Sequence, residues 1–182
     1  MDTLKLSASL LTFVFVGLIS GCSGTSMKSP DVSDSIRASL DQAGLKDVSI
    51  SQDRDKGVIT LSGHVAANAD KSQAESLARN YASGQVVADQ IAVVPPGVAG
   101  DARAVNADLD KGIANNLDAA LIQSQMHDSV KYSVKNGVAT LTGEVNSQSK
   151  RASAERLASS VPNVLQVVNE LQVKDQKATS SY

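Results

Sequence analysis

The sequence predicts an α+β protein made of two tandem small α-β-β-α-β sandwiches, each a three-stranded mixed sheet with two helices on one face. An internal repeat carries this prediction. The stretch Gly57–Val65 returns as Gly137–Val145, and the offset of 80 residues holds without a gap as far as Val93 and Val173. Hydrophobic spacing then switches between helical and strand periods in the same order in both copies. The 182 residues leave roughly 65–70 for each copy, which is enough for one modest core but not for a deep catalytic cavity.

The first copy is assigned to residues 34–94. Its helices follow from apolar residues at i, i+3 and i+4 after cap candidates, and its strands from alternation bounded by turn residues. In chain order the expected elements are a helix at 34–43, a strand around 48–52, a strand at 58–65, a helix from 68 or 69 to 82, and a strand at 86–94.

Four glycines are expected to have structural roles. Gly57 and Gly137 should shape the hairpin turns. In the following strand Ile59, Leu61 and Val65 should face the helices, which leaves Gly63, and likewise Gly143, where a side chain is missing. A glycine inside a strand marks close approach of another backbone, here expected to be a helix, with a ligand at the backbone as the alternative.

Residues 95–107 are predicted to be a linker, because they are rich in proline, glycine and alanine. Such a linker either lets the copies move or lies in their interface. The second copy, 108–174, starts with a longer helix whose apolar stripe includes Leu109, Ile113, Leu117 and Leu121. Residues 175–182 are polar and are expected to form a loose tail.

The N-terminus is predicted to be a targeting signal. Residues 1–21 contain an apolar run of about 14 residues, shorter than the ~20 that a membrane-spanning helix needs. The run ends Ile19-Ser20-Gly21-Cys22, which resembles the lipobox of bacterial lipoprotein signals. That resemblance implies cleavage before Cys22 and acylation of this only cysteine by lipid chains such as palmitate; a plain secretory signal and a short anchor are the alternatives. Several acyl chains would make membrane attachment stable.

The chain after Cys22 is expected to place the protein in the bacterial envelope. Residues 22–33 are small and polar and are predicted to be a flexible tether. Ser23 stands where an aspartate would favour inner-membrane retention, so the expected location is the periplasmic face of the outer membrane. The alternative is a soluble periplasmic protein.

Composition argues against nucleic acid as a partner. The net charge is −2 and aromatic residues make up 3% of the chain, so neither a basic surface nor a stacking platform for bases is expected.

Three recurring patterns resemble the BON (bacterial OsmY and nodulation) domain family. They are the Gly-Val-x-x-Leu-x-Gly-x-Val strand, the Ala-Glu-x-Leu-Ala helix at 74–78 and 154–158, and the closing strand at 164–173. The first copy departs from the pattern where Asp89 replaces an asparagine. The resemblance implies a non-enzymatic envelope protein that binds phospholipid membranes and is linked to osmotic or envelope stress. A lipobox before tandem copies is similar to the outer-membrane lipoproteins that maintain envelope integrity.

The residues offer no catalytic, metal or cofactor site. His64 and His127 do not correspond between the copies, and no cluster of Cys, His and carboxylates is expected. Glu75 and Glu155 do correspond. We interpret them as parts of a solvated face, or as local ion pairs with Arg79 or with Lys150 and Arg151, rather than as a general acid–base pair.

Five basic residues of the second copy form the candidate membrane-binding set: Lys131, Lys135, Lys150, Arg151 and Arg156. A basic cluster of this kind is typical of contact with anionic phospholipid head groups, and an ordinary solvated helix face is the alternative. Ile122 and Met126 either add an apolar contact or belong to the core.

The competing function is that of a structural or protein-interaction adaptor of the envelope, without lipid recognition beyond its own anchor. In that case the sheet face opposite the helices is available to pair with the other copy or with envelope proteins. This face carries Val58, Thr60, Val138 and Thr140.

Overall fold

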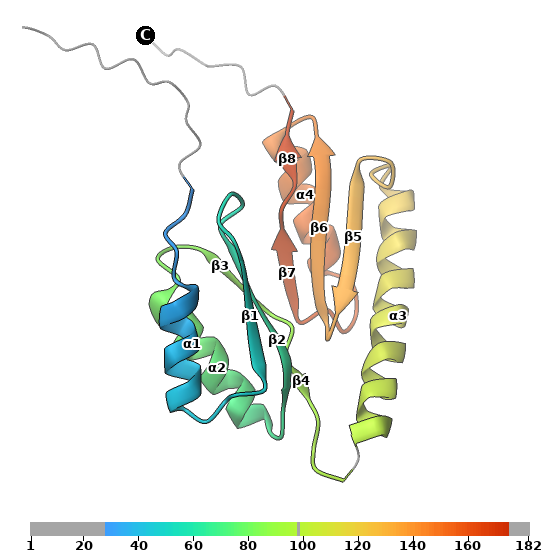
Figure 1. Ribbon diagram of the computed structural model, residues 1–182. Coiled ribbons are helices and arrows are strands. Elements are labelled where there is room, and N and C mark those ends of the chain that lie inside the picture. The colour runs from blue at the N-terminus through green and yellow to red at the C-terminus, as the bar shows by residue number, and fades with distance from the viewer. Residues whose placement is uncertain (1–27, 98, 175–182) are drawn as a thin grey trace, which may run out of the picture.

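The structure is a computed structural model that describes residues 28–97 and 99–174. Two copies of the order α-β-β-α-β follow one another, as Figure 1 shows. This architecture confirms the predicted fold class. The predicted signal peptide at 1–21, the lipidation site Cys22 and the tail at 175–182 lie outside the described residues.

The elements lie within a few residues of those expected from periodicity, apart from the start of α3. In the first copy they are α1 (Ser33–Gln42), β1 (Val48–Asp53), β2 (Val58–Val65), α2 (Asn68–Tyr81), β3 (Val86–Asp89) and β4 (Ala92–Val93). In the second they are α3 (Ala99–Gln123), β5 (Val130–Lys135), β6 (Val138–Val145), α4 (Gln148–Ser159), β7 (Gln166–Asn169) and β8 (Gln172–Val173).

Each sheet is mixed, with its longest strand in the middle. β2 pairs antiparallel with β1 and parallel with β3 and β4, and β6 does the same with β5, β7 and β8. The predicted third strand is therefore interrupted in both copies. The Asp89 carboxylate accepts a hydrogen bond from Ile91 N at 3.1 Å, and Asn169 Oδ1 accepts one from Leu171 N at 3.2 Å. These local turns break the strand at the same place in each copy.

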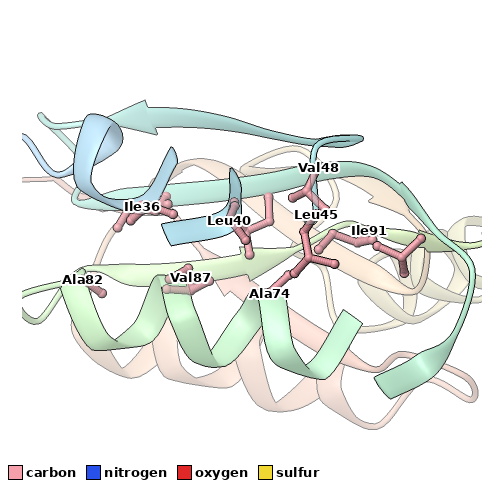
Figure 2. Close-up of a cluster of buried hydrophobic side chains, with 12 residues drawn as sticks. Ile36, Leu40, Leu45, Val48, Ala74, Ala82, Val87 and Ile91 are labelled. Atoms are coloured by element: carbon pink, nitrogen blue, oxygen red, sulfur yellow. The ribbon is translucent and has the colours of Figure 1, made fainter. Parts of the chain in front are cut away.

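The core of each copy lies between its helices and one face of its sheet. In the first copy Ile36 and Leu40 of α1 pack with Leu61 of β2 and Ala74 of α2, all fully buried (Figure 2). Each buried large aliphatic side chain contributes roughly 1.5–3 kcal/mol relative to an exposed one. The second core repeats this arrangement with Ile113, Leu117, Leu121, Val130, Leu141 and Ala154. Leu109, predicted to extend that stripe, is instead 43% exposed.

Gly63 is approached by a carbonyl group and not by a helix. A Cβ at Gly63 would lie 2.1 Å from Asp47 O, in the turn before β1, and the φ angle of Gly63 is +102°. Gly143 repeats this contact with Ser129 O at 2.4 Å. Both the contact and the positive φ exclude a side chain, so the glycines let the α–β turn close over the end of the central strand. Gly57 and Gly137 lie in the hairpin turns at φ +68° and +78°.

Two segments predicted to be irregular are ordered against the rest of the chain. Residues 28–32, within the predicted tether 22–33, bind the β1–β2 hairpin: Ser29 N donates to Arg54 O at 2.9 Å and Gln52 Nε2 donates to Pro30 O at 2.7 Å. α3 begins at Ala99, inside the predicted linker 95–107. Alanine has the highest helix propensity, so the alanine-rich part of that stretch continues the helix backwards.

Candidate functional site

The two copies pack against each other through the sheet faces that lie opposite their helices. Val58 and Ala88 of the first copy and Val138 and Val168 of the second form a shared cluster, each at most 6% exposed. This confirms that the face predicted to be available for pairing meets the other copy. The same contact removes the centre of that face from the surfaces open to a partner.

A glutamine side chain seals the edge of β3. Gln166 Nε2 donates to Val87 O at 2.6 Å, and Gln166 Oε1 accepts from Asp89 N at 3.0 Å. β3 is the outer strand of its sheet, so these main-chain groups would otherwise lack a partner. The residue equivalent to Gln166 in the first copy is Val86, which cannot do the same for β7. The interface is therefore not fully symmetric.

Two further contacts join the copies in equivalent places. Lys56 Nζ donates to Glu170 Oε2 at 2.6 Å, and Asn136 Nδ2 donates to Gln90 O at 2.8 Å. Asn136 stands 80 residues after Lys56, as Glu170 does after Gln90, so each hairpin turn reaches the same point of the other copy.

The hydrogen bond to Glu170 raises the pKa of Lys56 above its usual value of 10.5. Hydrogen bonding from the Lys56 main chain lowers the pKa of Asp53.

A cleft of about 310 Å³ opens between the copies. Its walls come from the start of α2, from β4, from α3, from the β5–β6 turn and from the loop before β7. The lining residues are Asn68, Lys71, Ile91, Ala92, Val93, Asn106, Leu109, Asp110, Asn136, Gly137, Asn163 and Leu165.

The predicted basic set does not form one patch. Lys131 and Lys135 lie on β5 and point away from the helices, whereas Lys150 and Arg156 lie on α4. Lys150 and Arg156 share a groove with Met126 beside the end of α3. Arg151 turns inward, with its guanidinium donating to Asn169 O at 3.1 Å. Among the described residues, the other four form no ion pair.

The two corresponding glutamates are occupied by local contacts. Glu75 pairs with Arg79 at 2.6 Å, as the ion-pair interpretation predicted. Glu155 instead accepts from Asn169 Nδ2 at 2.9 Å, not from Lys150 or Arg151. At the position of Asn169 the first copy has Asp89, whose pKa is raised by burial despite Lys71 at 3.9 Å.

The histidines are not assembled into a reactive site. His127 Nε2 lies 3.2 Å from Asp118 Oδ1, which also accepts from Tyr132 OH at 2.9 Å. Burial and the neighbouring Asp118 raise the pKa of the Tyr132 hydroxyl. This cluster ties α3 to β5. Within residues 28–97 and 99–174, no group of three or more His, Cys, Asp or Glu residues could hold a metal ion.

The sequence pattern did not reveal the cleft or the polar contacts between the copies. The available signal was the set of positions where the copies differ: Val86 against Gln166, Lys56 against Asn136, and Gln90 against Glu170. Positions that have the same structural role in each copy carry matching residues, whereas positions that make contacts between the copies can carry different ones.

The fold and the shared cluster define a class of protein: a tandem of small α-β-β-α-β domains joined through their sheets. The chain belongs to the BON domain family, which matches residues 29–95 and 109–175. It is 30% identical over 160 residues to the osmotically-inducible protein Y of Escherichia coli (strain K12), covering 83% of this chain and 75% of that protein.

Solved structures offer a weaker likeness. Two structures of CdsD, the structural protein of the Type III secretion system of Chlamydia trachomatis, align with 79% and 82% of this chain and with 92% and 100% of their own. Their identities are 18% and 17%, and both TM-scores are 0.35. At this TM-score the likeness carries no conclusion about function.

Proposed function

We propose that the chain is a non-enzymatic, lipid-anchored protein of the bacterial envelope that contacts the phospholipid surface and serves under osmotic or envelope stress. The link to stress rests on the similarity to the osmotically-inducible protein Y. None of the described helices is both long and apolar enough to cross a bilayer. The anchor in this proposal is the acylated Cys22, after the lipobox-like Ile19-Ser20-Gly21.

The observation that carries the proposal is the docked segment that follows the predicted anchor. Lys28 pairs with Asp55 at 3.3 Å, and Arg54 Nε donates to Ser29 O at 2.8 Å. Only five residues, 23–27, separate Cys22 from Lys28. At about 3.6 Å per residue, Cys22 lies no more than about 22 Å from Lys28. The β1–β2 turn would therefore stay close to the bilayer.

Two basic residues without ion pairs among the described residues, Lys131 and Lys150, lie on elements that start toward the same end of the molecule. In Figure 1 the β1–β2 turn, the end of α3 and the start of both β5 and α4 lie at the upper end. Lys150 is in the first turn of α4 and Lys131 is near the start of β5, whereas Arg156 is in the last turn of α4 and lines the groove with Lys150 and Met126. Ile122, 55% exposed, adds an apolar side chain near the end of α3. Each basic side chain near an anionic surface contributes about 1 kcal/mol.

The anchor is tested by replacing Cys22 with serine and fractionating the envelope, together with mass spectrometry of the mature N-terminus. We expect an acylated Cys22 in the membrane fraction and loss of membrane attachment in Cys22→Ser. An unmodified N-terminus, or a serine variant that stays in the outer membrane, would remove the anchor from the account.

Head-group contact is tested separately with the chain that begins at Ser23 and vesicles with or without anionic lipid. The variant Lys150→Glu with Arg156→Glu should lose sedimentation with anionic vesicles. Its matched control is Lys135→Glu with Arg103→Glu, which makes the same charge change at exposed residues toward the other end of the molecule. Equal loss in both variants would show that only net charge matters.

The second candidate function is a protein-interaction adaptor of the envelope. One observation favours it: the cleft between the copies combines polar side chains, among them Lys71 and Asp110, with the exposed leucines Leu109 and Leu165, and such a mixture is typical of ligand sites. Crosslinking in cells followed by mass spectrometry distinguishes the two, because an adaptor yields one dominant protein partner and shows no dependence on anionic lipid.

A further inference from the structure

The cleft between the copies exposes part of a strand edge, at Val93. Ala92 lies opposite His64 of β2, and Val94 N donates to Val65 O at 2.8 Å. In this parallel register the N–H and C=O groups of Val93 point away from β2. Val93 lines the cleft, and among the described residues neither of these groups forms a hydrogen bond.

Side chains bind four other main-chain groups of this edge. Gln166 binds Val87 O and Asp89 N, the Asp89 carboxylate accepts from Ile91 N, and Lys71 Nζ donates to Ile91 O at 2.8 Å. Within the cleft, the main-chain groups of Ile91 are bound in this way and those of Val93 are not. An open edge of this kind is a template for pairing with another extended chain.

The two charged side chains in the cleft, those of Lys71 and Asp110, are already bound to main-chain groups. Lys71 is engaged with Ile91 O, and the Asp110 carboxylate accepts from Asn136 N at 2.7 Å and from Gly137 N at 2.9 Å. Three asparagines have side-chain amides that bind no other group of the described residues: Asn68, Asn106 and Asn163. Leu109 and Leu165, 43% and 75% exposed, supply apolar surface.

We propose that this cleft binds an extended peptide segment of a partner protein, whose main chain pairs with Val93 and whose aliphatic side chains pack on Leu109 and Leu165. A peptide main chain offers N–H and C=O groups in alternation, which match both the strand edge and the asparagine amides. The volume of about 310 Å³ encloses a short stretch of chain, not a folded domain. An anionic ligand fits less well, because Lys71 already has a partner and Asp110 is close by. This proposal is independent of the lipid anchor.

The test uses a displayed library of random nonapeptides selected against the purified full-length protein, followed by calorimetry with the synthetic peptides. Val93→Pro removes the edge N–H, and proline is tolerated on edge strands. Leu165→Glu changes a side chain that is 75% exposed, so we expect the variant protein to fold normally. The matched control is Val173→Pro, the equivalent position of the second copy outside the cleft.

We expect selected peptides with aliphatic residues at alternating positions, and amide shift changes at Val93 on binding. Val93→Pro and Leu165→Glu should each weaken binding by about tenfold or more, as loss of a hydrogen bond or of apolar contact implies, while Val173→Pro leaves it unchanged. The proposal is overturned if no peptide is enriched, or if the enriched peptides bind Leu165→Glu as tightly as the unmodified protein.

Discussion

Lys56 Nζ lies 2.6 Å from Glu170 Oε2, so one ion pair joins the first hairpin turn to the opposite edge of the second copy. The Lys56 side chain is 41% exposed and that of Glu170 12% exposed. Because Lys56 is partly screened by water, we expect a double-mutant cycle of Lys56→Ala and Glu170→Ala to give a coupling of about 0.5–1 kcal/mol in unfolding experiments. Additive effects of the two substitutions would contradict a pairing in solution.

The same ion pair predicts a pH dependence at alkaline pH. The pKa of Lys56 is raised in the folded protein, so its stabilising contribution is fully present below the unfolded value of 10.5. The contribution is lost as the pH rises through the folded pKa. We therefore expect the coupling measured by the cycle to be constant from neutral pH to about 10 and to shrink above it, with 1 M salt weakening it throughout.

Gln166→Leu should loosen the contact between the copies. The substitution leaves Val87 O and Asp89 N without their partner, which costs roughly 1–3 kcal/mol for a buried group. Hydrogen exchange is the direct readout, and the Asp89 amide should exchange faster by tenfold or more. Gln123→Leu, at an exposed site on the end of α3, is the matched control. Unchanged protection of Asp89 would show that Gln166 does not seal this edge.

Asp89→Asn should stabilise the protein at neutral pH. Burial raises the pKa of Asp89, so stability falls as the pH rises from the unfolded value of 3.8 to the folded pKa, above which the folded state holds an ionised carboxylate. The asparagine keeps the acceptor for Ile91 N, as Asn169 does for Leu171 N. The stability gain should be absent below about pH 3.8 and should grow to a plateau above the folded pKa. A variant that is less stable at pH 7 would show that the Lys71 pairing outweighs burial.

Gly63→Ala should destabilise the first copy by more than about 2 kcal/mol, because a non-glycine residue at positive φ costs about 1–3 kcal/mol before any clash. The new Cβ would also lie 2.1 Å from Asp47 O, a backbone atom that no rotamer change can move. Gly112→Ala, in the middle of α3 with no atom within 4 Å of the new Cβ, should instead stabilise by about 0.5–1 kcal/mol. Thermal unfolding of the two variants compares them directly.

The repeat and its periodicity were sufficient to predict the fold. Ile59, Leu61 and Val65 of the central strand are buried in the first core, and their equivalents Ala139, Leu141 and Val145 are buried in the second. The errors have a common physical cause. The ordered segment at 28–32 depends on Gln52 and Arg54, which are distant in sequence, so composition alone indicated a flexible tether. The approach of Asp47 O to Gly63 likewise depends on the conformation of the turn before β1, which the spacing of apolar residues does not specify.

The candidate sites were less predictable than the fold. The basic set combined residues by charge, although Arg151 bonds inward to Asn169 while Lys150 stays exposed. The cleft depends on the packing of the two sheets, and a linear pattern does not encode that arrangement. Only the differences between the copies, such as Val86 against Gln166, marked the contact region.

The depth of two labels in the bilayer tests the lipid-anchored orientation most directly. Cys22 is the only cysteine and would be acylated, so one introduced cysteine carries a unique label. Asp55→Cys places it in the β1–β2 turn and Arg103→Cys in the first turns of α3, at opposite ends of the molecule in Figure 1. The eight residues of β6 alone span about 26 Å. We expect lipid-borne quenchers to act on the label at 55 and not on the label at 103, and equal or reversed quenching would contradict the account.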